Sequence, residues 1–153
     1  MAFAIRSPAF ENGTPIPPKY TRDGENISPP LQWRDVPAGT ESLALIIEDP
    51  DAPSGVFRHW AVYNIKPTQK SLAEGMNGIR AEAFGCGVND FGNARYDGPQ
   101  PPQDDDAHHY HFRLLALDVP SLDLLPTAKA GDVLATARDH MIDEVELVGT
   151  FKS

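Results

Sequence analysis

Cysteine is almost missing from this sequence of 153 residues, in which Cys86 stands alone. One cysteine cannot form an internal disulfide, so a small secreted domain held together by disulfides is excluded. No apolar stretch approaches the roughly 20 residues of a membrane-spanning helix. Residues 1–10 lack the basic start and apolar core of a signal peptide. We therefore expect a cytoplasmic protein with no membrane span.

Basic residues are scarce, since 13 Lys and Arg stand against 22 Asp and Glu, and the formal net charge is −9. A chain of this charge repels nucleic acid and acidic membrane surfaces. We expect no nucleic acid partner. A small anion would bind only through local hydrogen-bond donors that overcome the overall field.

Proline and glycine, in contrast, are plentiful, with 15 and 12 copies spread along the chain. This distribution is typical of short elements joined by tight turns and favours β structure. A hydrophobic content of 41% suits one core of ordinary size. The sequence predicts a single domain over residues 1–153, mainly β.

Three segments predict the main strands. Leu43–Ile47 and Trp60–Ile65 have the length and the β-branched or aromatic content of buried strands. His108–Leu117 resembles a central strand, on which His108, Tyr110, Phe112 and Leu114 point to the same side. In the second segment, alternation places four residues on one face, namely His59, Ala61, Tyr63 and Ile65.

Three further segments predict smaller elements. A short helical turn is expected around Ser71–Met76. Apolar residues recur with helical spacing over Ala130–Met141, which predicts one late helix. Val145–Phe151 predicts a closing strand.

The loop between the first two predicted strands, DPDAPSGVFRH from Asp49 to His59, concentrates reactive groups. Pro50 and Pro53 stiffen it along a non-helical path. Two carboxylates after one strand and a histidine before the next could converge on a shared pocket, and histidine changes charge near neutral pH. The same residue types also build ordinary turns, so a plain hairpin is the alternative interpretation.

Six motifs, in order, then resemble a known family. They are YTRDGENISPPLQW from Tyr20, DPDAP from Asp49, the pair His59-Trp60, NDFG from Asn89, YDGPQPP from Tyr96 with HHYHF from His108, and ELVGTF from Glu146. Together they resemble the phosphatidylethanolamine-binding protein family, most closely its bacterial Raf-kinase-inhibitor-like branch. The resemblance covers nearly the whole chain.

This resemblance implies an antiparallel, Greek-key-like β-sandwich with a short C-terminal helix, and a homodimer. It also implies a small pocket for phosphate, phosphorylated head groups or other small anions, with a cis peptide at one of the pocket prolines. Carried over to this sequence, the pocket residues are Asp49, Asp51, Ala52, Pro53, His59, Gly98, Gln100, Pro101, His108 and Tyr110.

The sequence departs from the bacterial pattern near this pocket. Gln100 stands where relatives often have a small residue or cysteine, and His109 stands where arginine is usual. Arg22 replaces a frequent cysteine, and three aspartates, Asp104–Asp106, follow the second loop. These changes bear on which ligand the pocket accepts.

The predicted residues suit an anion because a phosphate needs donors from several directions. His59, His108 and Tyr110, with the backbone amide of Gln100, would supply them. Asp49 would repel a dianion, so we expect it to orient or charge a histidine, or to accept a hydrogen bond from a protonated ligand. Binding would then strengthen as the pH falls toward the histidine pKa.

A metal site is a first alternative, because His109 and His111 lie two apart after the acidic run Asp104–Asp106. A cupin-like site would also need a glutamate where Leu115 and Ala116 stand. We therefore expect no metal and no cofactor.

A hydrolase is the second alternative, with an Asp and His pair that activates water or a nucleophile. No serine lies in a Gly-x-Ser-x-Gly elbow, and Gly85-Cys86-Gly87 lacks the third glycine of a dinucleotide fingerprint. We expect a non-enzymatic protein that binds a small anion and regulates a partner protein. A hydrolase or metal-assisted enzyme using the same residues is the alternative.

Overall fold

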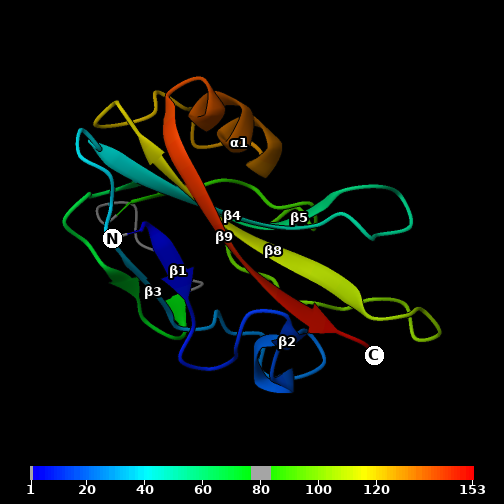
Figure 1. Cartoon of the computed structure of the whole chain (residues 1–153). Coiled ribbons are helices and arrows are strands. Elements are labelled where there is room, and N and C mark those ends of the chain that lie inside the picture. Colours follow the sequence, from blue (N-terminus) through cyan, green and yellow to red (C-terminus); the bar gives the residue numbers. More distant parts are fainter. Residues whose placement is uncertain (1, 77–83) are drawn as a thin grey trace.

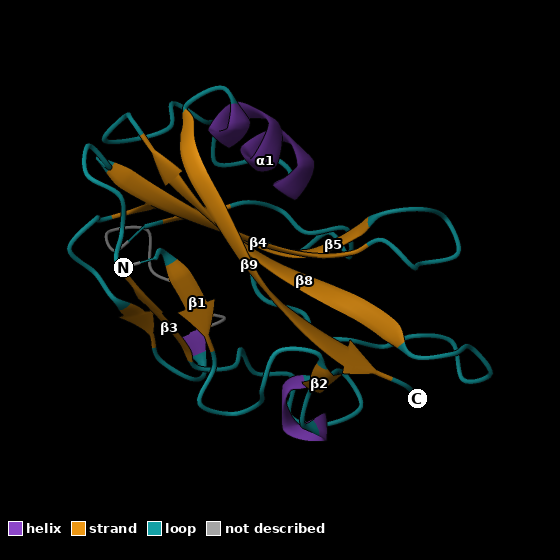
Figure 2. Cartoon of the chain, viewed as in Figure 1, coloured by secondary structure: helices purple, strands orange, loops and turns teal. Residues whose placement is uncertain are grey.

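The computed structural model describes residues 2–76 and 84–153, which form two β-sheets and a short α-helix (Figure 1; Figure 2). In chain order the elements are β1 (Ala4–Arg6), β2 (Thr14–Pro15), the 3-10 helix η1 (Pro18–Tyr20), β3 (Leu31–Arg34), β4 (Ser42–Asp49), β5 (Phe57–Ile65), β6 (Ser71–Leu72), β7 (Gly85–Cys86), β8 (His108–Leu117), α1 (Ala130–Arg138) and β9 (Met141–Phe151). The predicted mainly β class with a short C-terminal helix is confirmed.

The larger sheet has the strand order β2-β9-β8-β4-β5-β7, and the smaller has the order β1-β3-β6. Among the strands named above, all pairs are antiparallel except β2 with β9. β8 pairs with β9 on one side and β4 on the other, as expected for a central strand. Every residue of β4 is buried, because both its edges are paired and both its faces are covered.

Two hydrophobic cores cover the two faces of the larger sheet. Tyr110, Phe112 and Leu114 of β8 belong to the core between the sheets, which confirms their predicted common face. Leu115 and Leu117 belong to a second core under α1. Figure 2 shows α1 and the smaller sheet on opposite sides of the long strands.

A β-bulge near the end of β5 overturns part of the predicted alternation. Leu43 pairs with Ile65 but Leu45 pairs with Val62, so two residues of β5 face one residue of β4. Asn64 has a positive φ of 61° there. Ile65 consequently packs in the core between the sheets, and its predicted place beside Tyr63 is wrong.

Two predicted helical segments are corrected. Ser71 and Leu72 pair with β3 as a strand, so no helical turn forms at those two residues. The late helix ends at Arg138, because Met141 pairs with Leu117 and begins β9. The closing strand therefore starts before the predicted Val145.

The described residues contain no cis peptide bond, so the cis proline implied by the resemblance is wrong. Within residues 2–76 and 84–153, no helix combines the length and the apolar character that crossing a bilayer requires.

Candidate functional site

The β4–β5 loop, the segment after Tyr96 and the start of β8 enclose a cavity of about 310 Å³. Its lining residues are Asp49, Ala52, Pro53, Ser54, Phe57, His59, Phe91, Gln100, Pro101, Pro102, His108 and Tyr110. Eight of the ten residues named from the sequence lie among them, and Asp51 and Gly98 do not. That they bind a ligand stays a prediction.

Asp49 ends β4 and places its carboxylate against the first residue of β8. Its Oδ1 accepts the backbone N–H of Asp51 at 2.8 Å, which is the local turn that an Asp-Pro sequence favours. Its Oδ2 accepts Nδ1–H of His108 at 2.6 Å. Both side chains are 4% exposed, so a buried carboxylate and imidazole form a pair inside the protein.

The second ring nitrogen of His108 is also occupied by a carboxylate, because Nε2 lies 2.8 Å from Oδ2 of Asp105. Carboxylates only accept hydrogen bonds, so this arrangement requires a proton on both nitrogens. Burial alone would lower the pKa of His108, but the bonds to Asp49 and Asp105 outweigh it and raise the pKa above 6.5. His108 is therefore an imidazolium held between two anions.

His59 reaches the same cavity through a second β-bulge. Ile47 pairs with Trp60 and Glu48 pairs with Arg58, so His59 has no direct partner on β4. Its ring lies 5.3 Å from that of Tyr110, a member of the core between the sheets. The predicted face shared with Ala61 and Tyr63 is therefore wrong for His59.

The tautomer of His59 follows from the hydrogen bond at its Nδ1. Nδ1 lies 2.8 Å from the backbone carbonyl oxygen of Asp97, and a carbonyl only accepts, so Nδ1 carries the proton. Burial lowers the pKa of His59 below 6.5, although the bond to Asp97 opposes this. At neutral pH the ring is uncharged, and its Nε2 is a hydrogen-bond acceptor.

Asp97 holds that carbonyl in place. Its fully buried carboxylate accepts hydrogen bonds from the side chains of Asn26, Asn89 and Asn93, each at 2.9 Å, and it pairs with Arg95 at 3.1 Å. Burial opposes ionisation, but these donors outweigh it and lower the pKa of Asp97 to about 2. Asn89 of the NDFG motif thus helps to position His59.

Tyr110 contacts both histidines, with ring centroids 5.3 Å from His59 and 6.5 Å from His108. Burial raises the pKa of its hydroxyl, with further contributions from Asp49 and Asp51. The hydroxyl thus keeps its proton and is a potential donor to a ligand.

Apart from Ser54 and Gln100, the remaining wall is apolar. Phe57 and Phe91 meet edge to face with centroids 4.7 Å apart, and Phe91 also contacts the ring of His59. The guanidinium carbon of Arg22 lies 4.1 Å from the centre of the Phe91 ring, a cation–π contact. Aromatic rings and prolines therefore surround a few polar atoms.

Asp51 and Gly98 have other roles. Asp51 accepts hydrogen bonds from the backbone N–H and the Nδ1 of His109, and it lines an adjacent cavity of about 300 Å³. Gly98 packs against the backbone of Tyr20, because a Cβ at this position would lie 2.1 Å from the Tyr20 carbonyl oxygen. Its N–H donates to Oδ1 of Asn26.

The pocket residues predicted from the sequence did not include Ser54, Phe57, Phe91 and Pro102, which line the cavity, or Asp97, which bonds to His59. Asp104–Asp106 had been placed near the pocket, but the contact of Asp105 with His108 was not predicted. Ser54 and Phe57 lie inside the Asp49–His59 loop, so their position in that loop could have indicated that they line the cavity. Asp97 acts through its backbone carbonyl, and no residue pattern signals such a contact.

The proposed metal ligands are engaged elsewhere. His111 Nδ1 lies 3.2 Å from Glu146 Oε2, and His109 pairs with Asp51. Among the residues that the structure describes, no group of three or more His, Cys, Asp or Glu side chains is placed to hold a metal ion.

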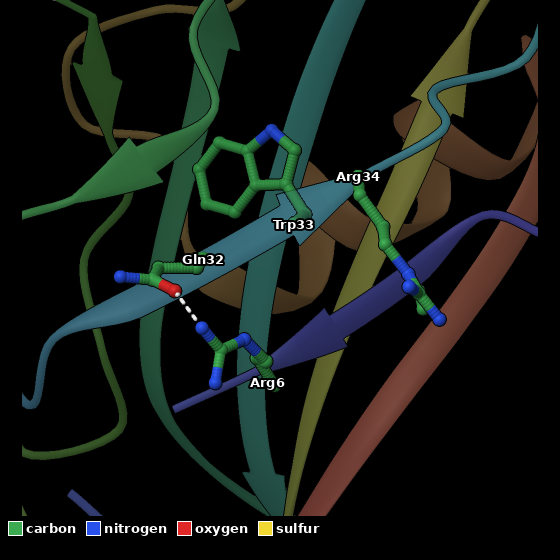
Figure 3. A pocket seen from close by; sticks show the side chains of 5 residues that line it. Arg6, Gln32, Trp33 and Arg34 are labelled. Carbon is green, nitrogen blue, oxygen red and sulfur yellow. Dashed lines mark hydrogen bonds between the residues drawn. The ribbon is translucent and has the colours of Figure 1, made fainter. Parts of the chain in front are cut away.

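A larger cavity of about 580 Å³ lies on the smaller sheet, lined by Ala4, Arg6, Gln32, Trp33 and Arg34. Figure 3 shows Arg6 and Gln32 pointing toward one another, and the guanidinium donates to Gln32 Oε1 at 2.7 Å. None of the residues named from the sequence lines this cavity. The described lining lacks an acid and base pair comparable to Asp49 and His108.

Comparison with known proteins yields one family. The family model described as "Phosphatidylethanolamine-binding protein" matches residues 6–152. A UPF0098 protein of Methanothermobacter thermautotrophicus is 45% identical over 150 residues, covering 97% of each chain. A UPF0098 protein of Aquifex aeolicus is 42% identical over 149 residues, covering 97% of this chain and 87% of its own.

Two crystal structures share the fold. That of Escherichia coli YbcL, described as a new member of the mammalian PEBP family, has a TM-score of 0.94 and 29% identity, covering 100% of this chain and 99% of its own. That of CT736 from Chlamydia trachomatis, a putative phosphatidylethanolamine-binding protein homologue, has a TM-score of 0.88 and 39% identity, covering 99% and 98%.

Proposed function

This chain belongs to the phosphatidylethanolamine-binding protein family, and on that premise we propose that it is a non-enzymatic protein that binds a small oxyanion, such as phosphate or a phosphorylated head group. The observation that carries the proposal is the buried imidazolium of His108 in the wall of the 310 Å³ cavity. An imidazolium N–H donates a charge-assisted hydrogen bond to an anionic oxygen, and such a local donor works even in a chain that carries −9 overall. The volume suits a small ligand.

The state of His59 narrows the ligand further. Its neutral ring has a hydrogen-bond acceptor at Nε2. This lone pair repels a fully ionised oxygen but accepts a hydrogen bond from an O–H group. A monoanionic phosphate or phosphomonoester has both an anionic oxygen and a hydroxyl. We therefore favour a protonated oxyanion over a dianion as the bound form.

Binding is favoured over hydrolysis because the hydroxyl in the cavity lining is not hydrogen-bonded to a histidine that could activate it. Ser54 is a hydroxyl side chain in the cavity lining, and within the described residues it makes no hydrogen bond to either histidine. A general base must lie within hydrogen-bond reach of its nucleophile. His108, with both nitrogens protonated, cannot act as that base.

The test is isothermal titration of phosphate, phosphoethanolamine and acetate into the wild type, His108→Ala and His140→Ala, at pH 6 and pH 8. His140 is an exposed histidine outside the cavity and serves as the matched control. We expect saturable binding at pH 6 that weakens at pH 8, survives in His140→Ala and is lost in folded His108→Ala. Absence of binding in the wild type would refute the proposal, and turnover of a chromogenic phosphoester that is lost in His59→Ala would favour the hydrolase.

We also propose a homodimer, a cytoplasmic location and a regulated protein partner, which the family resemblance supports. Sedimentation equilibrium of the purified chain tests the first, because a mass near 33 kDa would be twice the 16.7 kDa of the monomer. A monomer at micromolar concentration would contradict it.

A further inference from the structure

We propose that Asp105 is an internal competitor for the oxyanion site, and that a ligand binds by taking the place of its carboxylate on Nε2 of His108. This inference rests on the proposed function, because the incoming group is the same small oxyanion. It names the residue that limits access to the buried cation.

The first argument is the number of donors. An imidazolium has two N–H groups, and Asp49 and Asp105 accept one each, at 2.6 Å and 2.8 Å. The one ring N–H of neutral His59 donates a hydrogen bond to the backbone carbonyl of Asp97. Neither histidine therefore retains an N–H for an anion, so a ligand that uses His108 has to displace one of the two carboxylates.

The second argument identifies which carboxylate leaves. The side chain of Asp49 is 4% exposed and is also held by the backbone N–H of Asp51. The side chain of Asp105 is 38% exposed, and within the described residues His108 is its one hydrogen-bond partner. Moving Asp105 into water restores its hydration at little structural cost, whereas moving Asp49 would leave a buried charge unpaired.

The third argument is the position of the contact. His108 lines both the 310 Å³ cavity and the neighbouring 300 Å³ cavity, whereas Asp105 lines only the latter. His108 is thus the lining residue that the two cavities share. Asp104 and Asp106, on either side of Asp105, are exposed, so the segment has room to move outward.

The exchange is balanced in charge. A carboxylate oxygen and a phosphate oxygen both accept a charge-assisted hydrogen bond from an imidazolium N–H. His108 therefore stays paired on both nitrogens before and after ligand binding. The free energy of the Asp105–His108 contact is then subtracted from the affinity for every ligand that uses Nε2.

The experiment is titration of inorganic phosphate into the wild type, Asp105→Ala and Asp104→Ala at pH 6, below the raised pKa of His108 in the wild type, with the protonation of His108 in each variant followed by NMR. Both substitutions remove one negative charge from the same segment, so the overall field changes equally. We expect Asp105→Ala to bind phosphate roughly fivefold to tenfold more tightly than the wild type, because a competing charge-assisted contact is gone. Asp104→Ala should stay within about twofold, as expected for an exposed charge.

Binding by the wild type with no gain in Asp105→Ala relative to Asp104→Ala would overturn the competition and leave the proposed function intact. No phosphate binding in any of the three folded proteins would remove the proposed function itself. A second readout is the ¹³Cγ resonance of Asp105 in the wild type, which should move at saturating phosphate as its carboxylate leaves His108. A resonance that stays in place at saturation would also overturn the exchange.

Discussion

The ring of His59 donates its Nδ1 proton to the backbone carbonyl of Asp97, 2.8 Å away, while both side chains stay almost fully buried. His108, in the same cavity, is bonded to carboxylates at both nitrogens. One cavity thus contains a histidine that burial keeps neutral and another that anions keep charged. Their environments shift the two pKa values in opposite directions from 6.5.

The first prediction concerns these two titrations. NMR titration of the imidazole resonances should give a pKa below 6.5 for His59 and above 6.5 for His108. Replacing Asp49 by Asn should lower the pKa of His108 strongly, because it removes the more deeply buried of its two carboxylate partners. Equal pKa values for the two rings in the wild type would contradict this electrostatic assignment.

The second prediction concerns the pH dependence of the free energy of unfolding. His108 affects it above pH 6.5, and His59 affects it below pH 6.5. The raised pKa of His108 adds stability that is fully present below pH 6.5 and is lost as the pH rises through the folded-state pKa. The lowered pKa of His59 adds stability that is present above pH 6.5 and is lost as the pH falls through its folded-state pKa. In urea unfolding, His108→Gln should flatten the decline above pH 6.5, whereas His59→Gln should flatten the decline just below it. A His108→Gln protein with an unchanged alkaline decline would be inconsistent with the buried imidazolium.

The third prediction concerns Asp97. In Asp97→Asn an amide nitrogen would replace one carboxylate oxygen, so a donor group would face either the side chain of Asn26 at Oδ1 or those of Asn89 and Asn93 at Oδ2, and the hydrogen bonds to a buried charge would be lost. We expect a loss of about 2–4 kcal/mol in the free energy of unfolding.

The wild-type contribution of Asp97 is present above pH 3.8, the ordinary pKa, and disappears as the pH falls through about 2. The difference between wild type and Asp97→Asn should therefore shrink below pH 3.8. Asp104→Asn, at an exposed carboxylate, should change stability by less than about 0.5 kcal/mol. An equally small effect at Asp97 would show that its network adds little.

Cys86 supports a fourth prediction. Burial raises the pKa of its thiol to about 11. At pH 8 few native molecules carry the thiolate, so a disulfide reagent such as DTNB should react about 100-fold or more slowly than with the urea-unfolded chain. Equal rates in the two states would mean that the segment around Cys86 opens readily.

The strands could be predicted because their side chains repeat regularly. The cores of β4, β5 and β8 follow the apolar runs, and the alternation along β8 is unbroken, so Tyr110, Phe112 and Leu114 face the same core as predicted. The two bulges in β5 could not be predicted from the alternation, because each inserts one extra residue into the strand and so reverses the face of the residues beyond it. That addition moved Ile65 and His59 to the face opposite the predicted one.

The sequence motifs predicted where the candidate cavity lies, but they did not predict the charges and hydrogen bonds of its residues. The motifs brought Asp49, His59 and His108 together, but they indicated two histidines with donors free for an anion. The structure reverses this, because one ring nitrogen faces a backbone carbonyl and the other ring is enclosed by two carboxylates. Such contacts depend on how the loops fold back over the cavity, and no repeating pattern of residues in the sequence predicts that.

The last prediction concerns Gly98, which the family resemblance placed in the pocket and the structure places against Tyr20. A Cβ at residue 98 would lie 2.1 Å from the Tyr20 carbonyl oxygen, so Gly98→Ala must push the two backbones apart. We expect a loss of about 1–3 kcal/mol in the free energy of unfolding, measured by urea titration. Gly131→Ala is the matched control, because its Cβ would approach only the guanidinium of Arg58, at 3.3 Å, and alanine is the better helix former by about 1 kcal/mol. Gly131→Ala should therefore be neutral or stabilising, and equal stability in the two variants would show that the contact with Tyr20 tolerates a methyl group.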